Sequence, residues 1–118
     1  AFLAASRGGD FMALLSLLDP NVVLRADAAT VAASLAAQAK GAPRLEPEIH
    51  GAEAVARTFA GRAQAVRPAL IDGAPGLLLA TDGVPQVAFR FTIVDGKISG
   101  IDLIADTERL GRLAIEVR

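Results

Sequence analysis

Hydrophobic and polar residues alternate most regularly over residues 86–106, QVAFRFTIVDGKISGIDLIAD. Two runs rich in Val, Ile and Phe are separated there by only Asp95 and Gly96, a pair typical of a two-residue type I′ hairpin turn. Such a turn makes Val94 and Lys97 the closing pair and sets the register of both strands. We therefore expect the domain to be organised around this hairpin.

In the register that follows, Asp102 lies on the apolar face of the hairpin, opposite Phe89. A carboxylate surrounded by apolar side chains has a raised pKa and could act as a proton shuttle, with His50 as its partner. The alternative is that Gly100 forms a β-bulge, which would turn Asp102 outward. The pattern leaves both orientations of Asp102 open.

Helical periodicity appears upstream of the hairpin. Apolar residues at helical spacing predict helices over 11–18 and 52–66, and an alanine-rich run predicts another over 27–40. The helix over 27–40 has a thin apolar stripe, essentially Val31 and Leu35, so we expect it to lie at the periphery.

Short strands are expected outside the hairpin as well. Two precede the helices over 27–40 and 52–66, at 22–25 and about 48–50, and two follow them, at 69–72 and 77–80. The expected loops include 72–76 and 81–85, which are rich in Asp, Gly and Pro. Helices followed by antiparallel strands predict a single α+β domain over residues 1–118, with about three N-terminal helices packed on a curved, mainly antiparallel sheet.

The helices and the curved sheet would together enclose a cone-shaped space, and this space could hold a pocket. The residues predicted to line that pocket are Phe59, Phe89, Phe91 and Asp102.

The amino-acid composition narrows the range of functions that the chain could have. The 118 residues carry twelve basic and thirteen acidic side chains, scattered without a basic block, so we expect no direct nucleic-acid binding. Cysteine is absent and His50 is the only histidine, so we expect no metal site and no cofactor. No run of 18 apolar residues exists, so we expect no membrane segment.

Three phrases of the sequence resemble one family. They are FLAASRGGDFMALLSLLDPNVVLRAD, GAPRLEPEIHGAEAVARTFAGRA and PALIDGAPGLLLATDGVPQVAFRFTIVDGKISGIDLIADTERLGRL. Together they resemble the SnoaL-like (NTF2-like) C-terminal domain of extracytoplasmic-function RNA polymerase sigma factors, SigJ-like type. The resemblance implies a domain from the C-terminus of a longer sigma factor, which regulates transcription initiation without catalysis.

Two family motifs are tied to that role. The glycine-rich Asp-Gly-Gly-Gly-Lys loop matches residues 27–31, which read DAATV, so only Asp27 is kept. The Asn-Pro-Asp-Lys-Leu phrase matches residues 106–110, which read DTERL and keep an acid, a base and the leucine. The resemblance thus implies an interaction surface at Asp27, Asp106, Glu108, Arg109 and Leu110.

The expected partners are the helical sigma domains and the RNA polymerase core, in the cytoplasm. The competing hypothesis is a small-molecule-binding or isomerase-like domain that uses Asp102 and His50 in the cone, with an unknown small ligand. Because fold alone does not determine activity, both hypotheses stand at this stage.

NTF2-like domains often pair through the outer face of their sheet. Ile101, Leu103 and Val94 are predicted to lie on that face, so a homodimer is a further expectation.

Overall fold

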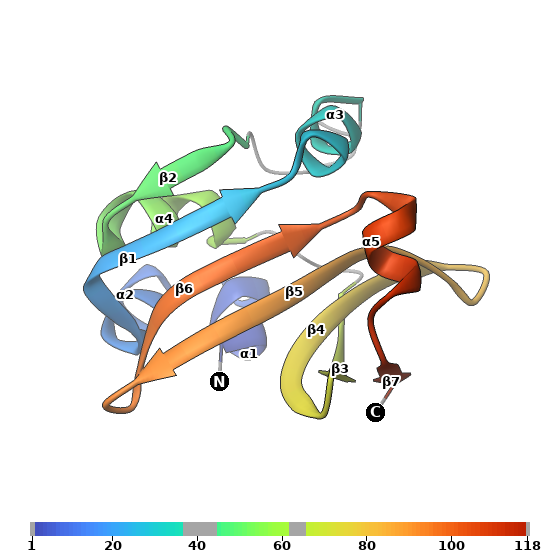
Figure 1. The fold of residues 1–118 in the computed structure, drawn as a ribbon. Coiled ribbons are helices and arrows are strands. Elements are labelled where there is room, and N and C mark those ends of the chain that lie inside the picture. The colour runs from blue at the N-terminus through green and yellow to red at the C-terminus, as the bar shows by residue number, and fades with distance from the viewer. Residues whose placement is uncertain (1, 37–44, 62–65, 118) are drawn as a thin grey trace.

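The computed structural model describes residues 2–36, 45–61 and 66–117 (Figure 1). These residues form helices and strands in the order α1 (Phe2–Arg7), α2 (Phe11–Leu17), β1 (Leu18–Ala26), α3 (Ala28–Ala36), β2 (Glu48–His50), α4 (Ala52–Phe59), β3 (Arg67–Ile71), β4 (Ala74–Thr81), β5 (Val84–Val94), β6 (Lys97–Ile104), α5 (Thr107–Gly111) and β7 (Ile115–Val117).

Three Asp-Gly turns connect strands β3 to β6 into an antiparallel meander. The φ angles are 51° and 80° at Asp72-Gly73, 52° and 77° at Asp82-Gly83, and 51° and 76° at Asp95-Gly96. Positive φ at both central residues is what a type I′ turn requires. The hairpin turn predicted at Asp95-Gly96 is confirmed, whereas the loops predicted over 72–76 and 81–85 are shorter than expected.

All seven strands belong to one sheet, in the order β2-β1-β6-β5-β4-β3-β7. β1 runs parallel to β6, and every other neighbouring pair is antiparallel. The predicted α+β class and mainly antiparallel sheet are therefore confirmed. β7 was not predicted; it pairs with β3 and forms one edge of the sheet, while β2 forms the other.

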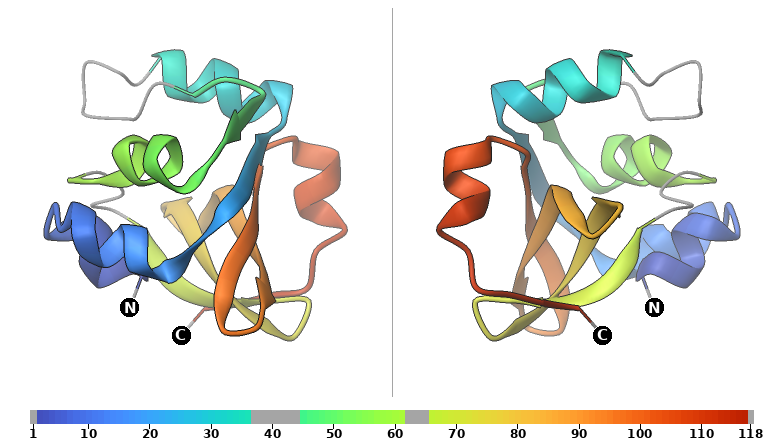
Figure 2. Two further views of the ribbon diagram at one scale, coloured as in Figure 1. Left: turned by 90° about the vertical axis from the view of Figure 1, so that its left-hand side faces the viewer. Right: turned by 90° about the vertical axis from the view of Figure 1, so that its right-hand side faces the viewer.

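Helices lie on both sides of this sheet (Figure 2). α1, α2 and α4 cover one side, which we call the inner face, and α5 lies against the other, the outer face. On the inner face the ring of Phe59 lies 5.4 Å from that of Phe2 and 6.1 Å from that of Phe89, between ring centroids. A smaller apolar cluster beneath α5 includes Leu78, Ala88 and Ile104.

A β-bulge changes the register of the β5–β6 hairpin beyond its closing pair. Ser99 is an extra residue in β6, so Asp102 pairs with Arg90 instead of Phe89. Because successive side chains in a strand point to opposite faces, Asp102 lies on the outer face. The register that placed Asp102 among the phenylalanines is wrong, and the alternative with a bulge next to Gly100 is confirmed.

The same shift turns Ile101 and Leu103 inward. They are 0% and 2% exposed and belong to the inner core, so the prediction that they present an outer-face dimer surface is wrong. Val94, at the hairpin tip, is 51% exposed.

Two helices differ from their predictions. α3 buries Thr30 and Ser34, and Val31 packs partly buried against the inner core, whereas Leu35 is 68% exposed. Only Val31 of the expected stripe therefore faces the protein. Residues 37–40 of that predicted helix lie outside the described residues. α4 ends at Phe59 rather than at 66, and residues 62–65 of that prediction also lie outside the described residues.

Gly76 in β4 provides a test of the sheet packing. A Cβ atom there would lie 2.5 Å from the carbonyl oxygen of Phe89 and 2.8 Å from Cγ1 of Ile71. Because the Phe89 oxygen belongs to the backbone and cannot move aside cheaply, Gly76→Ala should lower the free energy of unfolding by about 1–3 kcal/mol. Urea denaturation measures the change.

Gly111→Ala is the matched control, since nothing lies within 4 Å of a Cβ atom at Gly111. Because Gly111 is a helical residue without a positive φ, this change should leave the free energy of unfolding unchanged or raise it by up to about 1 kcal/mol. Equal stability of the two variants would contradict the close approach of β4 to its neighbours.

Candidate functional site

Asp27 directly follows β1 and caps the first turn of α3. Its Oδ1 atom accepts hydrogen bonds from the backbone N–H of Thr30 at 2.8 Å and from the Thr30 hydroxyl at 2.6 Å. This is the usual way in which an aspartate satisfies the free N–H groups at the start of a helix. These contacts also account for the burial of Thr30, which is 2% exposed.

The same carboxylate binds the segment that leaves β6. The backbone N–H groups of Ala105 and Asp106 each donate to its Oδ2 atom at 3.0 Å, and Nη1 of Arg109 lies 3.4 Å from that oxygen. We call Asp27, Thr30, Ala105, Asp106 and Arg109 the Asp27 junction. It joins the start of α3 to the start of α5.

The junction determines the protonation of Asp27. Burial raises the pKa of this carboxyl, since its side chain is only 10% exposed, but the hydrogen bonds from Thr30, Asp106 and Ala105 outweigh burial. The pKa is therefore held below its ordinary value, and Asp27 carries a negative charge.

α5 displays the remaining residues of the predicted interaction surface. Asp106 caps this helix by accepting a hydrogen bond from the backbone N–H of Arg109 at 3.0 Å. Glu108 forms an ion pair with Arg112 at 2.6 Å, and both side chains are about three-quarters exposed. Leu110 is half-buried, because it packs on the cluster beneath the helix.

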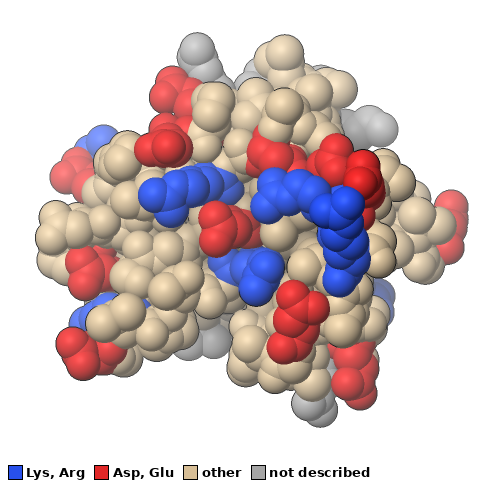
Figure 3. All heavy atoms as spheres, in the orientation of Figure 1, with Lys and Arg blue, Asp and Glu red and all other residues tan. Residues whose placement is uncertain are grey.

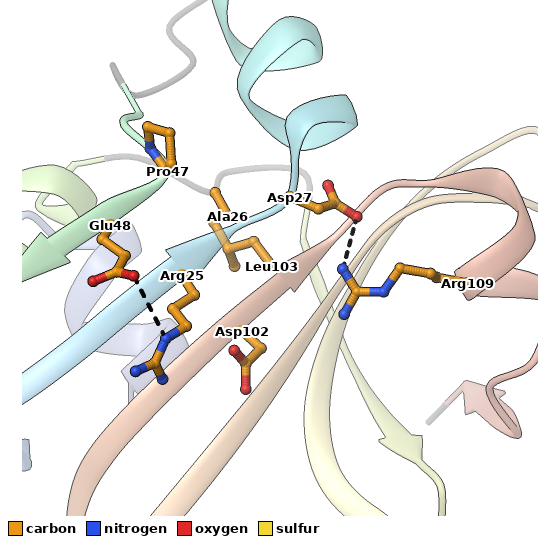
Figure 4. Close-up of a pocket in the computed structure, with 8 residues that line it drawn as sticks. All are labelled: Arg25, Ala26, Asp27, Pro47, Glu48, Asp102, Leu103 and Arg109. Atoms are coloured by element: carbon orange, nitrogen blue, oxygen red, sulfur yellow. Dashed lines mark hydrogen bonds and ion pairs between the residues drawn. The ribbon is translucent and has the colours of Figure 1, made fainter.

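A shallow pocket of about 260 Å³ opens on the outer face beside the junction (Figure 4). Its lining residues are Arg25, Ala26, Asp27, Pro47, Glu48, Asp102, Leu103 and Arg109. Nε of Arg25 lies 4.0 Å from Oε2 of Glu48 on one side, and Arg109 contacts Asp27 on the other. Asp102 lies between the two arginines and makes no ion pair within the described residues.

His50 does not join Asp102. It lies on β2, where its Nε2 atom is 2.8 Å from Oε1 of Glu48, and its side chain is 66% exposed. His50 and Asp102 are both on the outer face, whereas the rings of Phe59 and Phe89 are buried on the inner face. The structure thus separates Asp102 from the phenylalanines that were predicted to share a pocket with it.

Sequence reasoning missed the pocket residues Arg25 and Glu48. Both lie at alternating strand positions that point away from a buried face, and only the pairing of β1 with β2 and β6 places them together. In the part of the chain that the structure describes, no group of three or more acidic, His or Cys residues could hold a metal ion. No helix in those residues is long and apolar enough to cross a membrane.

Comparison with solved structures identifies the fold. The extracytoplasmic-function sigma factor SigJ of Mycobacterium tuberculosis superposes with a TM-score of 0.63 and 22% identity, over 93% of this chain. An NTF-2 like protein of unknown function from Burkholderia xenovorans LB400 matches 97% of this chain and 88% of its own, with a TM-score of 0.53 and 14% identity. The fold is NTF2-like.

Proteins with this NTF2-like fold differ in function. An LEH-like epoxide hydrolase of M. tuberculosis matches 92% of this chain and 79% of its own, with a TM-score of 0.50 and 19% identity. This chain spans 42% of the SigJ sigma factor. No family model matches the sequence, and no curated protein is significantly similar to it. The fold alone therefore does not decide between regulation and catalysis.

Asp27→Asn tests the junction. The Asp27 carboxylate stabilises the fold at every pH at which it is ionised. The variant should therefore lose about 2 kcal/mol of unfolding free energy at pH 7. Because the pKa of Asp27 is lowered on folding, its contribution is fully present above its unfolded pKa, near 4, and declines as the pH falls further. The stability difference between wild type and variant should therefore shrink below about pH 4.

Urea denaturation at several pH values measures this difference. Asp82→Asn is the matched control, since Asp82 is an exposed turn residue with a φ of 52° that asparagine tolerates. A difference for Asp27→Asn that stays constant from pH 7 to pH 3 would contradict an ionised, hydrogen-bonded Asp27.

Proposed function

We propose that this chain is a non-catalytic regulatory domain of an extracytoplasmic-function RNA polymerase sigma factor. In this proposal the domain modulates transcription initiation by contacting the helical sigma domains, with the RNA polymerase core as the larger assembly. The start of α3 and the exposed side of α5 are the contact surface.

The Asp27 junction is the observation that carries this proposal. The family resemblance connects residues 27–31 and 106–110 with contacts to the sigma domains, although Asp27 and Asp106 are 79 residues apart in the sequence. The hydrogen bonds that Asp27 accepts from the backbone N–H groups of Ala105 and Asp106 and from the side chain of Arg109 hold these two segments side by side. One continuous partner surface could therefore contact both.

The superposition on the SigJ sigma factor adds support. Its TM-score of 0.63 exceeds the 0.50 of the epoxide hydrolase, although both proteins are less than 25% identical to this chain. The likeness to SigJ is one of fold, and the motif residues make the link to regulation.

The catalytic alternative receives less support from the side chains. The catalytic hypothesis requires Asp102 and His50 to meet inside the cone as acid and base. Both residues instead lie on the outer face and do not contact each other. The fully buried polar side chains among the described residues are Ser6, Thr30 and Ser34, which are neutral at physiological pH, and the largely buried Asp27 has a lowered pKa rather than a raised one. The catalytic alternative would require a carboxylate in apolar surroundings that raise its pKa.

An exchange of charges on α5 tests the proposal in the full-length protein. The double variant E108R/R112E keeps an ion pair on the helix but reverses both charges that a partner would meet. We expect promoter-specific transcription with core polymerase to change by about fivefold, equivalent to roughly 1 kcal/mol, and crosslinks from α5 to the sigma domains to be lost.

The double variant E53R/R57E is the matched control. Glu53 and Arg57 form the same kind of exposed ion pair on α4, on the opposite side of the sheet, so transcription should stay unchanged. Wild-type transcription and crosslinking in E108R/R112E would contradict the proposed contact surface. A gene whose upstream region encodes no sigma domains would refute the proposed function as a whole.

A further inference from the structure

Side chains of both charges line the pocket on the outer face. Its two arginines, Arg25 and Arg109, lie on either side of Asp102 (Figure 4). Each arginine also lies beside a second acid, Arg25 beside Glu48 and Arg109 beside Asp27. Figure 3 shows acidic and basic side chains interspersed over the middle of this face. The pocket therefore presents hydrogen-bond donors and acceptors close together.

Asp102 is the pocket carboxylate whose charge the chain leaves unmatched. It makes no hydrogen bond or ion pair within the described residues. Arg90, its neighbour in register on β5, contacts Asp72 instead, at 3.7 Å. Asp72 is itself held in place, because its Oδ1 atom accepts a hydrogen bond from the backbone N–H of Ala114 at 2.8 Å. The oxygens of Asp102 are therefore available to a donor from outside the chain.

The two arginines keep donors that the chain does not use fully. Nε of Arg25 lies 4.0 Å from Glu48 and Nη1 of Arg109 lies 3.4 Å from Asp27. Charge-assisted hydrogen bonds are usually about 2.7–2.9 Å long, so neither contact is a strong one. The side chains of Arg25 and Arg109 are 60% and 51% exposed, so a ligand in the pocket can reach both guanidinium groups.

This mixture of charges discriminates between classes of small ligand. A simple anion would be attracted by the arginines but repelled by Asp102 between them. A simple cation would be attracted by Asp102 but repelled by the arginine on each side of it. A molecule that carries one positive and one negative group close together matches both kinds of side chain.

The spacing of Arg25 and Asp102 suits such a molecule. The two residues are paired in register on the neighbouring strands β1 and β6, yet their charged groups do not come within 4.0 Å of each other. A zwitterion between them replaces this gap with two charge-assisted hydrogen bonds. In an α-amino acid the ammonium and carboxylate groups are attached to the same carbon atom, so one small molecule can reach both side chains.

We propose that the pocket on the outer face binds a small zwitterion of the α-amino-acid class. Its ammonium group binds Asp102 and its carboxylate binds Arg25, while Arg109 attracts the carboxylate from the other side. The pocket volume of about 260 Å³ is below the roughly 300–1,000 Å³ of sites for drug-sized ligands, so the ligand is small.

Because the pocket is shallow and its charged side chains are exposed, the dissociation constant lies in the millimolar range. This proposal does not depend on the proposed sigma-factor function, because it needs only residues of the 118-residue chain.

Three probes test the charge requirement in NMR titrations of the isotope-labelled chain at pH 7. Glycine carries both charges, whereas acetate carries only the negative one and methylammonium only the positive one. Glycine should produce saturable shifts of the backbone amides of Ala26, Asp102 and Leu103, which line the pocket. Acetate and methylammonium should bind at least about tenfold more weakly, because each loses one of the two ion pairs.

Four single variants test the assigned contacts. Asp102→Asn and Arg25→Gln should each weaken glycine binding at least about tenfold, and Arg109→Gln should weaken it only about twofold, because Arg109 acts at longer range. Arg57→Gln is the matched control, since Arg57 is an exposed arginine on α4, on the opposite side of the sheet, and it should bind glycine like wild type. Circular dichroism checks that each variant is folded.

Several results would overturn the proposal. One is a wild-type chain that shows no saturable shift of these amides up to about 100 mM glycine. Acetate that binds as tightly as glycine would indicate an anion site, and methylammonium that binds as tightly would indicate a cation site, and either result contradicts a zwitterion site. Folded Asp102→Asn or Arg25→Gln with wild-type affinity for glycine would also refute it. If a variant does not fold, the comparison of the three probes on the wild-type chain still decides.

Discussion

The carboxylate of Asp27 accepts hydrogen bonds from two distant segments of the chain, and the candidate interface depends on this interaction. It caps α3 through Thr30 and binds the backbone N–H groups of Ala105 and Asp106 where β6 ends. A buried charge is costly unless hydrogen bonds satisfy it, so the position of each donor is tightly constrained. The directions of α3 and α5 are therefore coupled, because the same two oxygen atoms hold the start of both.

The two faces of the sheet have different chemistry. The inner face is filled by aromatic rings and aliphatic side chains from α1, α2 and α4. The outer face carries the Asp27 junction, the pocket and the charged side chains of Arg25, Asp102 and Arg90. A single residue produces part of this division, since the bulge at Ser99 sends Asp102 outward and Ile101 and Leu103 inward. The polar groups that could contact a partner therefore gather outside the cone.

The α+β class and the hairpin turn could be predicted because a two-residue Asp-Gly turn is a local signal. The same pair occurs at Asp72-Gly73 and Asp82-Gly83, but there the whole stretches 72–76 and 81–85 are rich in residues that tolerate turns, so longer loops were predicted. The bulge was harder to place, because it depends on how β6 pairs with both β1 and β5 rather than on Gly100 alone. Asp27 and Asp106 were singled out by resemblance, but their hydrogen-bonded contact was not, since it joins residues 79 apart in the sequence. Leu35 shows the same limit, because its exposure depends on how α3 packs in the folded protein and not on helical spacing alone, which correctly indicated Val31.

The central claim is that the start of α3 and the exposed side of α5 together contact the rest of a sigma factor. Hydrogen–deuterium exchange, compared between the full-length protein and the isolated 118-residue domain, tests it most directly. The account predicts that amides in 28–36 and 107–112 exchange about tenfold more slowly in the full-length protein, while those of α4 exchange equally in both. Equal exchange in all three segments would contradict it.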